Sequence, residues 1–169
     1  QELKCTEQEF PHDVVAELGL HSAIHGEKQY NGVAILSKEK PLQFRTDLLP
    51  AMYGSRLIEA EFEKATVWSV YVTNGREVGH EMYHTKLAFL GELRSAIVDY
   101  QSRNSKPLII AGDFNIAPDN SDVYDPIAWK GKILCSDAER HCLKEITDCG
   151  FIDCQKVITP ITDEYTWWD

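Results

Sequence analysis

A glycine followed by a carboxylate and a carboxamide, Gly112-Asp113-Phe114-Asn115, is the strongest chemical signal in the sequence. It follows a short, wholly apolar run, 107–111, which has the composition of a central strand buried on both faces. Because side chains two apart on a strand point to the same side, Asp113 and Asn115 are predicted to face one pocket. There an aspartate can orient or deprotonate water, and an asparagine can donate to a phosphoryl oxygen. The same residues are also typical of a turn with side-chain to backbone hydrogen bonds.

Three other side chains have types suited to a polar site. Glu2 lies beside Lys4 at the start of the chain, a pattern that by itself indicates only a surface charge pair. Tyr71 comes late in an apolar stretch, where it is either a phenol at the rim of a sheet or a half-buried strand tyrosine. Arg56 precedes a strand and is suited to a phosphate or to solvent.

The histidines and cysteines argue against several other chemistries. None of the six histidines has the spacing of a zinc ligand pair with a catalytic glutamate, and neither a nucleophile elbow nor a Walker loop is present. The five cysteines are odd in number and form no C-x-x-C pair, which argues against a disulfide framework and a zinc knuckle. This use of cysteine is typical of a reducing compartment, so we expect a cytoplasmic location.

The elements that must position these residues alternate between strand and helix patterns. With 169 residues, 43% of them hydrophobic, the chain is predicted to be a single α/β domain with a mixed sheet, and no apolar run reaches the roughly 20 residues of a bilayer span. The expected elements are a helix over 10–18, strands over 21–25 and 32–37, an antiparallel hairpin over 57–63 and 67–73, an amphipathic helix over 81–100, a helix capped by Ser136 and Glu139 that ends at Gly150, and a strand restarting at 151–152.

Charge narrows the possible partners. Lys and Arg number 17 against 27 Asp and Glu, and the net charge of −10 argues against a protein that coats nucleic acid non-specifically. A local basic groove is still compatible with this composition.

Seven segments, in order along nearly the whole chain, carry a resemblance to a known family. They are QELKCTEQEFP from Gln1, YNGVAILS from Tyr30, SRLIEAEF from Ser55, YVTNG from Tyr71, GDFNIAP from Gly112, GFIDC from Gly150 and YTWWD from Tyr165. Together they resemble the exodeoxyribonuclease III branch of the endonuclease/exonuclease/phosphatase superfamily. The resemblance implies a four-layered α/β sandwich, in which two mixed β-sheets lie face to face and are flanked by helices.

The resemblance also implies an activity and its catalytic residues. The chemistry is phosphodiester hydrolysis that depends on Mg²⁺, with Mn²⁺ as a substitute, and Glu2 is similar to the glutamate that ligates the metal. Asp113 resembles the aspartate that activates water, and Asn115 the asparagine bonded to the scissile phosphate. Tyr71 matches a phenol near that phosphate, acting either as a donor or as an aid to the nucleophile.

The implied substrate is double-stranded DNA with nicks, 3′ ends or abasic sites. The family combines 3′-to-5′ exonuclease, 3′-phosphatase and abasic-site endonuclease activities in DNA repair, and a monomer with no membrane partner is expected. Arg56 is assigned to substrate binding, and Trp167 and Trp168 resemble aromatic residues lining the pocket for an extruded abasic sugar. The candidates for contacts to the DNA backbone are Lys4, Arg56, Arg76 and Lys86.

The sequence departs from the family at several points. Thr73 stands where a proline is usual, and Lys156 where arginine is common. The family's first strand, with its asparagine, is expected before Gln1, and closing strands with an aspartate and an Asp-His pair are expected after Asp169. Residues 1–169 are therefore expected to be a partial domain, incomplete at both ends and inactive alone.

Two alternative functions stay open at this point. Other branches of the superfamily hydrolyse phosphoinositides or sphingolipids, and the acidic net charge suits them equally well. A catalytically dead protein that keeps the sandwich as a binding module is the other alternative, because the visible metal-binding set is incomplete.

Overall fold

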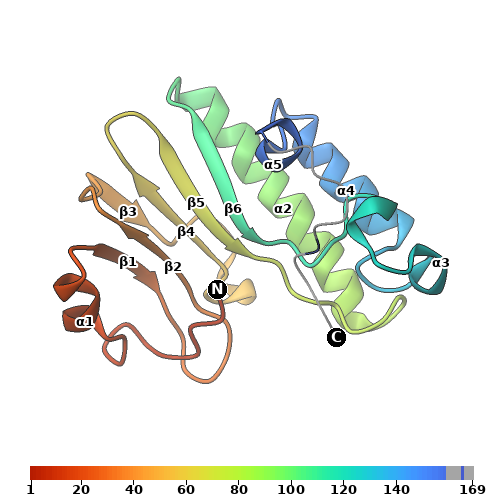
Figure 1. The fold of residues 1–169 in the computed structure, drawn as a ribbon, viewed down its shortest axis with the longest axis horizontal. Helices are drawn as coiled ribbons and strands as arrows, with labels where there is room; N and C mark the ends of the chain where they lie inside the picture. The colour runs from red at the N-terminus through yellow and green to blue at the C-terminus, as the bar shows by residue number, and fades with distance from the viewer. Residues whose placement is uncertain (159–164, 166–169) are drawn as a thin grey trace. The chain divides into compact units, whose positions relative to one another are not determined.

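Strands fill the first part of the chain and helices most of the remainder (Figure 1). A computed structural model describes residues 1–158 and residue 165. The elements in chain order are α1 (His12–Glu17), β1 (His21–His25), β2 (Val33–Ser37), β3 (Gln43–Arg45), η1 (Ala51–Tyr53), β4 (Leu57–Glu61), β5 (Thr66–Tyr71), α2 (Glu81–Arg103), β6 (Leu108–Asp113), η2 (Asn120–Asp122), α3 (Pro126–Trp129), α4 (Asp137–Thr147) and α5 (Cys154–Ile158).

The chain divides into two compact units. Unit 1 comprises Gln1–Val72 and Gln101–Phe114, and unit 2 comprises Thr73–Tyr100 and the chain from Asn115 onward. The chain leaves unit 1 for unit 2 directly after β5 and again directly after β6. The single partial domain expected from the sequence stays a prediction.

Unit 1 contains two β-sheets. In the first, β1 and β2 pair antiparallel, with His21 opposite Ser37. The second has the order β3-β4-β5-β6, in which β5 and β6 are parallel and the other neighbours antiparallel, so this sheet is the mixed one. The predicted α/β class with two sheets and helices is confirmed, as is the hairpin of β4 and β5.

The two sheets of unit 1 pack against each other, β1 and β2 contacting β4 and β5. Ala23, Val33 and Ile58 form a buried cluster between them, and Ile35 and Tyr71 pack against it. Alternation along each strand directs these apolar side chains to one face. Tyr71 therefore has its ring against the core while it stands at the last position of β5.

β6 differs from the strand that the sequence predicts. The apolar run does form a strand, but it is extended through Gly112 to Asp113, and within the described residues it pairs with β5 alone. Ile109 is consequently 51% exposed rather than buried on both faces. An apolar run indicates that a strand is suited to burial, but its burial in the fold depends on which elements cover it. No described element covers this side of Ile109.

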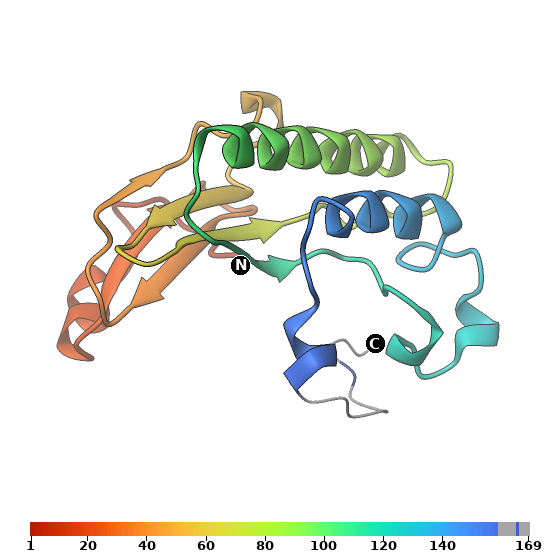
Figure 2. The ribbon, with the colours of Figure 1, turned by 90° about the horizontal axis from the view of Figure 1, so that it is seen from above.

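Most of unit 2 is helical, and α2 and α4 lie side by side in both ribbon views (Figures 1 and 2). The side chains of α2 at Tyr83, Leu90, Leu93 and Ile97 are buried, which confirms the amphipathic spacing. The capping box predicted for α4 is also present: the Ser136 hydroxyl accepts from the backbone N–H of the third helical residue, whose carboxylate accepts from the Ser136 N–H.

The strand predicted at 151–152 is wrong. These residues are irregular, and α5 begins shortly after them. Asp153 Oδ1 accepts hydrogen bonds from the backbone N–H groups of Gln155 and Lys156, at 3.0 and 3.3 Å, and so favours a helix start. Two apolar residues are too few to compete with this local signal. No helix in the described part of the chain is long and apolar enough to span a bilayer.

The register of β5 and β6 depends on a glycine. Gly112 lies opposite Val70 with φ +149°, and a Cβ at Gly112 would lie 1.9 Å from the Val70 carbonyl oxygen. We expect Gly112→Ala to lower the free energy of unfolding by about 3 kcal/mol, because it adds a steric clash to a strained backbone. The midpoint of urea unfolding of the protein that contains this chain measures the effect.

Gly91, inside α2, provides the matched control. A Cβ at Gly91 meets no atom within 4 Å. Gly91→Ala should therefore raise stability by about 0.5–1 kcal/mol, the usual gain in a helix interior. Equal effects of the two substitutions would show that the close approach at Gly112 does not limit the sheet.

Candidate functional site

The last residues of β5 and β6 bring two of the predicted site residues together. Tyr71 and Asp113 are Cα partners at the carboxyl ends of these parallel strands, and the Val72 N–H donates to the Asp113 carbonyl oxygen at 2.8 Å. In open α/β sheets, ligands bind beyond the carboxyl ends of parallel strands. Asp113 is exposed at this edge, so its carboxylate can meet a substrate from solvent.

Glu2 is held at this edge of the sheet by a hydrogen bond from Tyr71. The Tyr71 hydroxyl donates to Glu2 Oε1 at 2.8 Å, and Lys4 Nζ lies 2.7 Å from Glu2 Oε2. The Lys4 ammonium, followed by the Tyr71 phenol, lowers the pKa of Glu2, so its carboxylate is ionised at neutral pH. Tyr71 thus contacts Glu2 through its hydroxyl and is the strand partner of Asp113, and the catalytic roles of these residues stay predictions.

The segment that carries Glu2 has an unusual backbone. Glu2 and Lys4 both have φ of +56°, a left-handed conformation that costs roughly 1–2 kcal/mol for a residue with a Cβ. Backbone bonds hold the segment in place: Leu3 N donates to Gly32 O at 3.2 Å, and Lys4 N to Asn31 O at 3.0 Å. Strain of this kind persists where surrounding contacts over-determine the geometry, often at functional sites.

Arg56 is tied to the same tyrosine. Its guanidinium lies 4.8 Å from the centre of the Tyr71 ring, and Nη1 donates to the Tyr71 carbonyl oxygen at 3.3 Å. Burial lowers the pKa of Arg56, yet arginine stays protonated in proteins. Arg56 is therefore half-buried against Tyr71 rather than solvated. Its predicted contact with substrate stays a prediction.

The environment of Tyr71 decides what its phenol can do. Burial, followed by the hydrogen bond to Glu2 and the charge of Glu2, raises the pKa of Tyr71 to about 12. The Asp113 charge acts in the same direction, and Arg56 opposes it. The hydroxyl is consequently protonated at neutral pH and donates a hydrogen bond to Glu2, and its role beside a phosphate stays a prediction.

Asn115 belongs to unit 2 and is placed by a turn. The strand ends at Asp113, and Asn115 has φ +50°, so the predicted projection of both side chains from one continuous strand is wrong. Asn74 Nδ2 donates to Asn115 Oδ1 at 3.4 Å. The two amides follow β5 and β6 by three and two residues, respectively.

Asn74 is a candidate that residue types did not single out. Its Oδ1 accepts from the Arg76 backbone N–H at 3.1 Å, and both Gly75 and Arg76 have positive φ. The sequence feature that could have identified Asn74 is the Asn74-Gly75 pair, which indicates a tight turn shortly after β5. Sequence pattern alone does not show that this turn brings its amide to Asn115.

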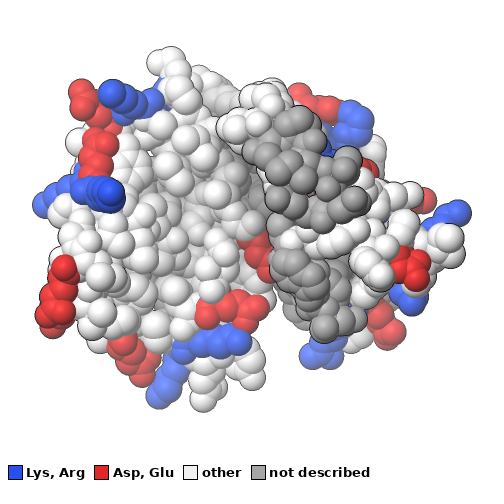
Figure 3. Space-filling model, viewed as in Figure 1, with Lys and Arg blue, Asp and Glu red and all other residues white. Residues whose placement is uncertain are grey.

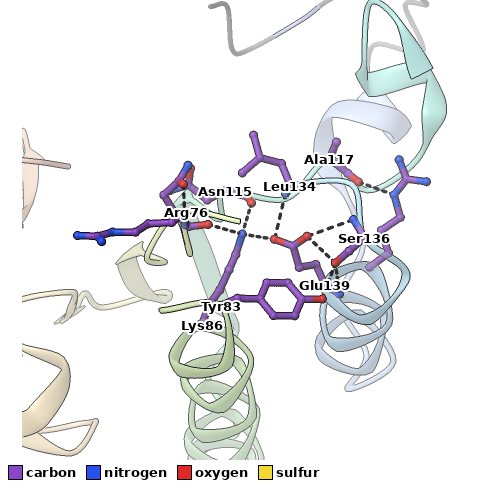
Figure 4. A network of polar contacts seen from close by, with 10 residues as sticks. Arg76, Tyr83, Lys86, Asn115, Ala117, Leu134, Ser136 and Glu139 are labelled. Atoms are coloured by element: carbon purple, nitrogen blue, oxygen red, sulfur yellow. Dashed lines mark hydrogen bonds and ion pairs between the residues drawn. The ribbon is translucent and has the colours of Figure 1, made fainter. Parts of the chain in front are cut away.

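The assignment of Lys86 to the DNA backbone is wrong. Its side chain is fully buried, and Nζ forms an ion pair with buried Glu139 and donates to the carbonyl oxygens of Asn74 and Asn115 (Figure 4). Residue type alone predicts a lysine in contact with solvent. A carboxylate 53 residues further on withdraws it from solvent instead.

The remaining residues predicted to contact DNA are either exposed or outside the described part of the chain. Lys4 and Arg76 are exposed, and their contacts to DNA stay predictions. Trp167 and Trp168 lie outside the described residues. On the face in Figure 3, the described Lys and Arg residues are interspersed with Asp and Glu around the periphery and form no continuous basic patch.

Glu2 is the residue of the site best suited to a hard metal ion. One of its oxygens already faces a cationic group, Lys4, and its side chain is 44% exposed. Mg²⁺ commonly binds proteins through one or two carboxylates and keeps several waters. Among the described residues, no group of three or more His, Cys, Asp or Glu side chains is arranged to hold a metal. A largely hydrated ion on a single carboxylate fits this set, whereas a dedicated protein cage does not.

Comparison with known proteins identifies the family. The model of the endonuclease/exonuclease/phosphatase family matches residues 1–169. Exodeoxyribonuclease III of Haemophilus influenzae is 30% identical over 185 residues, which cover 100% of this chain and 68% of that protein.

Two solved structures are similar throughout the chain. A 3′ phosphatase from Neisseria, bound to a product DNA hairpin, has a TM-score of 0.92 and 34% identity, covering 99% of this chain and 66% of its own. An AP endonuclease from Archaeoglobus fulgidus has a TM-score of 0.89 and 30% identity, covering 99% and 65%. The chain thus spans about two thirds of the length of each of these proteins.

These matches are to phosphoesterases that include DNA nucleases, and they support an enzyme of the exodeoxyribonuclease III type. Nucleases of the family depend on a divalent metal ion. The match of the family model over the whole chain shows that this chain belongs to the endonuclease/exonuclease/phosphatase family.

Proposed function

We propose that the protein containing this chain hydrolyses phosphodiester bonds in double-stranded DNA during repair, acting at nicks, 3′ ends and abasic sites with Mg²⁺ as its metal. The observation that carries the proposal is the Glu2–Tyr71 hydrogen bond beside Asp113 at the carboxyl ends of β5 and β6. The relatives support DNA as the substrate, because they include an exodeoxyribonuclease, an AP endonuclease and a phosphatase bound to a DNA hairpin.

Each residue of the site has a role in this proposal. Asp113, exposed at the strand end, takes a proton from the attacking water. Asn115 donates a hydrogen bond to a phosphoryl oxygen, and this bond strengthens as negative charge develops. Tyr71, a protonated donor, orients the Glu2 carboxylate. Glu2 would hold the divalent ion, which would supply positive charge toward the phosphate oxygens.

Two further proposals concern the location of the protein and its oligomeric state. None of the five cysteines, all of which lie in the described part of the chain, forms a disulfide, which supports the proposed cytoplasmic location. We also propose that the protein acts as a monomer. The phosphoinositide and sphingolipid alternative receives no support from the relatives named above.

Metal dependence is the first test of the proposed function. Cleavage of abasic duplex DNA by the protein that contains this chain should stop in EDTA and return with Mg²⁺ or Mn²⁺, and return poorly with Zn²⁺, which prefers softer ligands. Glu2→Gln should weaken Mn²⁺ binding, followed by electron paramagnetic resonance, by at least about tenfold. Glu17→Gln, on an exposed position of α1, is the matched control. Full cleavage in EDTA would contradict the metal assignment.

Asp113→Asn tests the general base. The amide keeps the shape of the carboxylate but cannot accept the proton, so we expect kcat to fall by about 10²-fold or more, with DNA affinity nearly unchanged. Asp13→Asn, an exposed position in the first turn of α1, should leave both unchanged. An Asp113→Asn enzyme that keeps more than about half of the rate would rule out this role. A wild-type protein that turns over phosphoinositides or sphingolipids instead of DNA would overturn the proposed substrate.

Tyr71→Phe tests the phenol as a donor. Removing the hydroxyl takes away one of the two hydrogen bonds that lower the pKa of Glu2, so this pKa should rise toward its ordinary value of 4.5. Because Glu2 acts ionised, the acidic limb of the pH–rate profile should move to higher pH, and the rate at neutral pH should fall roughly tenfold for a lost charged hydrogen bond. Tyr30→Phe, at an exposed tyrosine, is the control. An unchanged acidic limb would show that Tyr71 does not act through Glu2.

A further inference from the structure

Lys86 is a buried ammonium with three well-defined acceptors. Its side chain is fully buried, and Nζ donates to the carbonyl oxygens of Asn74 at 3.1 Å and Asn115 at 2.6 Å, and to Glu139 Oε1 (Figure 4). Each of these bonds uses an N–H donor of the ammonium group. Burying a charge is unfavourable unless it is paired and hydrogen-bonded in this way.

Glu139 is anchored as firmly as its partner. Its Oε1 also accepts from the Leu134 N–H at 3.1 Å, and its Oε2 accepts from the Ser136 N–H at 3.1 Å and the Ser136 hydroxyl at 2.6 Å. Tyr83, one turn before Lys86 on α2, has its hydroxyl 2.8 Å from Ser136 Oγ. The carboxylate is thus a fixed point in unit 2, and the direction of the Lys86 ammonium is fixed with it.

The two carbonyl groups that Lys86 holds belong to the two asparagines whose amides meet. Asn74 and Asn115 are 41 positions apart in the sequence, each in a turn after a strand, with their side chains 3.4 Å apart. Asn115 has φ +50°, a left-handed turn conformation that asparagine tolerates. A hydrogen bond to its carbonyl oxygen fixes its peptide plane, and the peptide plane determines where its side chain starts.

We propose that Lys86, anchored by Glu139, is a positioning residue for the nuclease reaction: it fixes the backbones of Asn74 and Asn115 and thereby aims both amides at the phosphoryl group. This inference rests on the proposed function. Lys86 touches neither substrate nor metal in this role. A misplacement of about 1 Å at a reacting group can reduce turnover about 10²-fold, so a buried residue can control catalysis in this way.

The test is a kinetic double-mutant cycle in the protein that contains this chain. Lys86→Met keeps the length of the side chain and removes its donors, and Asn115→Ala removes the amide. If Lys86 acts through Asn115, Lys86→Met should lower kcat about tenfold or more in the wild-type background and less than about twofold in the Asn115→Ala background, with little change in KM. An equal loss in both backgrounds, or an unchanged kcat, would overturn the proposal.

Two further variants separate positioning from stability. Leu93→Ala, at a fully buried position of α2 outside this network, should lower the melting temperature without lowering kcat at a temperature where the protein is folded. Lys86→Met alone leaves a buried carboxylate without its partner, and the variant with both Lys86→Met and Glu139→Met removes that unpaired charge. The double variant should melt at a higher temperature than Lys86→Met, with kcat still low. Recovery of kcat along with stability would show that Lys86 is only structural.

A spectroscopic measurement keeps this inference distinct from the proposed function. In ¹H–¹⁵N spectra, the side-chain amide signal of Asn115, assigned by its loss in Asn115→Ala, should be single and narrow in the wild type and Leu93→Ala, and shifted or broadened in Lys86→Met. A wild-type protein without nuclease activity would refute the proposed function. An Asn115 amide signal unaffected by Lys86→Met would refute the positioning role, whatever the activity.

Discussion

The parallel pairing of β5 with β6 is the constraint on which the candidate site depends. It continues to the last residue of each strand, so that Tyr71 stands opposite Asp113. The pairing requires Gly112, since any side chain there would collide with the Val70 carbonyl. A single absent Cβ therefore brings a phenol and a carboxylate to one edge of the sheet, where a third residue, Glu2, is hydrogen-bonded to the phenol.

Two of the candidate residues lie on backbone with positive φ. Glu2 in unit 1 and Asn115 in unit 2 have left-handed φ values, although neither is a glycine. Each is held by contacts from residues distant in sequence: Glu2 by Tyr71, and Asn115 by Lys86 and Asn74. Such conformations are maintained when the packing around them is stable. The stability of the core and the geometry of the proposed chemistry are thus linked through the same hydrogen bonds.

Local signals predicted the elements, and long-range contacts explain the errors. The capping box at Ser136, the hairpin of β4 and β5 and the spacing of α2 are each readable because their physics acts within a few residues. The exposure of Ile109 depends on what covers β6, and the burial of Lys86 depends on Glu139, so neither follows from local pattern. Asp113 and Tyr71 were predicted as site residues from their positions in the GDFNIAP and YVTNG segments. The turn at Asn115 is accompanied by contacts with Asn74 and Lys86, which are distant in sequence and do not follow from the alternation of side chains along a strand.

Most of the cations that were candidates for binding an anionic substrate already interact with other groups of this acidic chain. Three of the four candidates for phosphate contacts are engaged within the protein: Lys4 with Glu2, Arg56 over the Tyr71 ring, and Lys86 with Glu139. Two of these three cations, Lys4 and Lys86, are paired with a carboxylate, which offsets their charge. Phosphate carries a full negative charge that must be neutralised during hydrolysis. In the proposed function a divalent cation would supply that neutralisation, and the ionised Glu2 carboxylate is the group proposed to hold it.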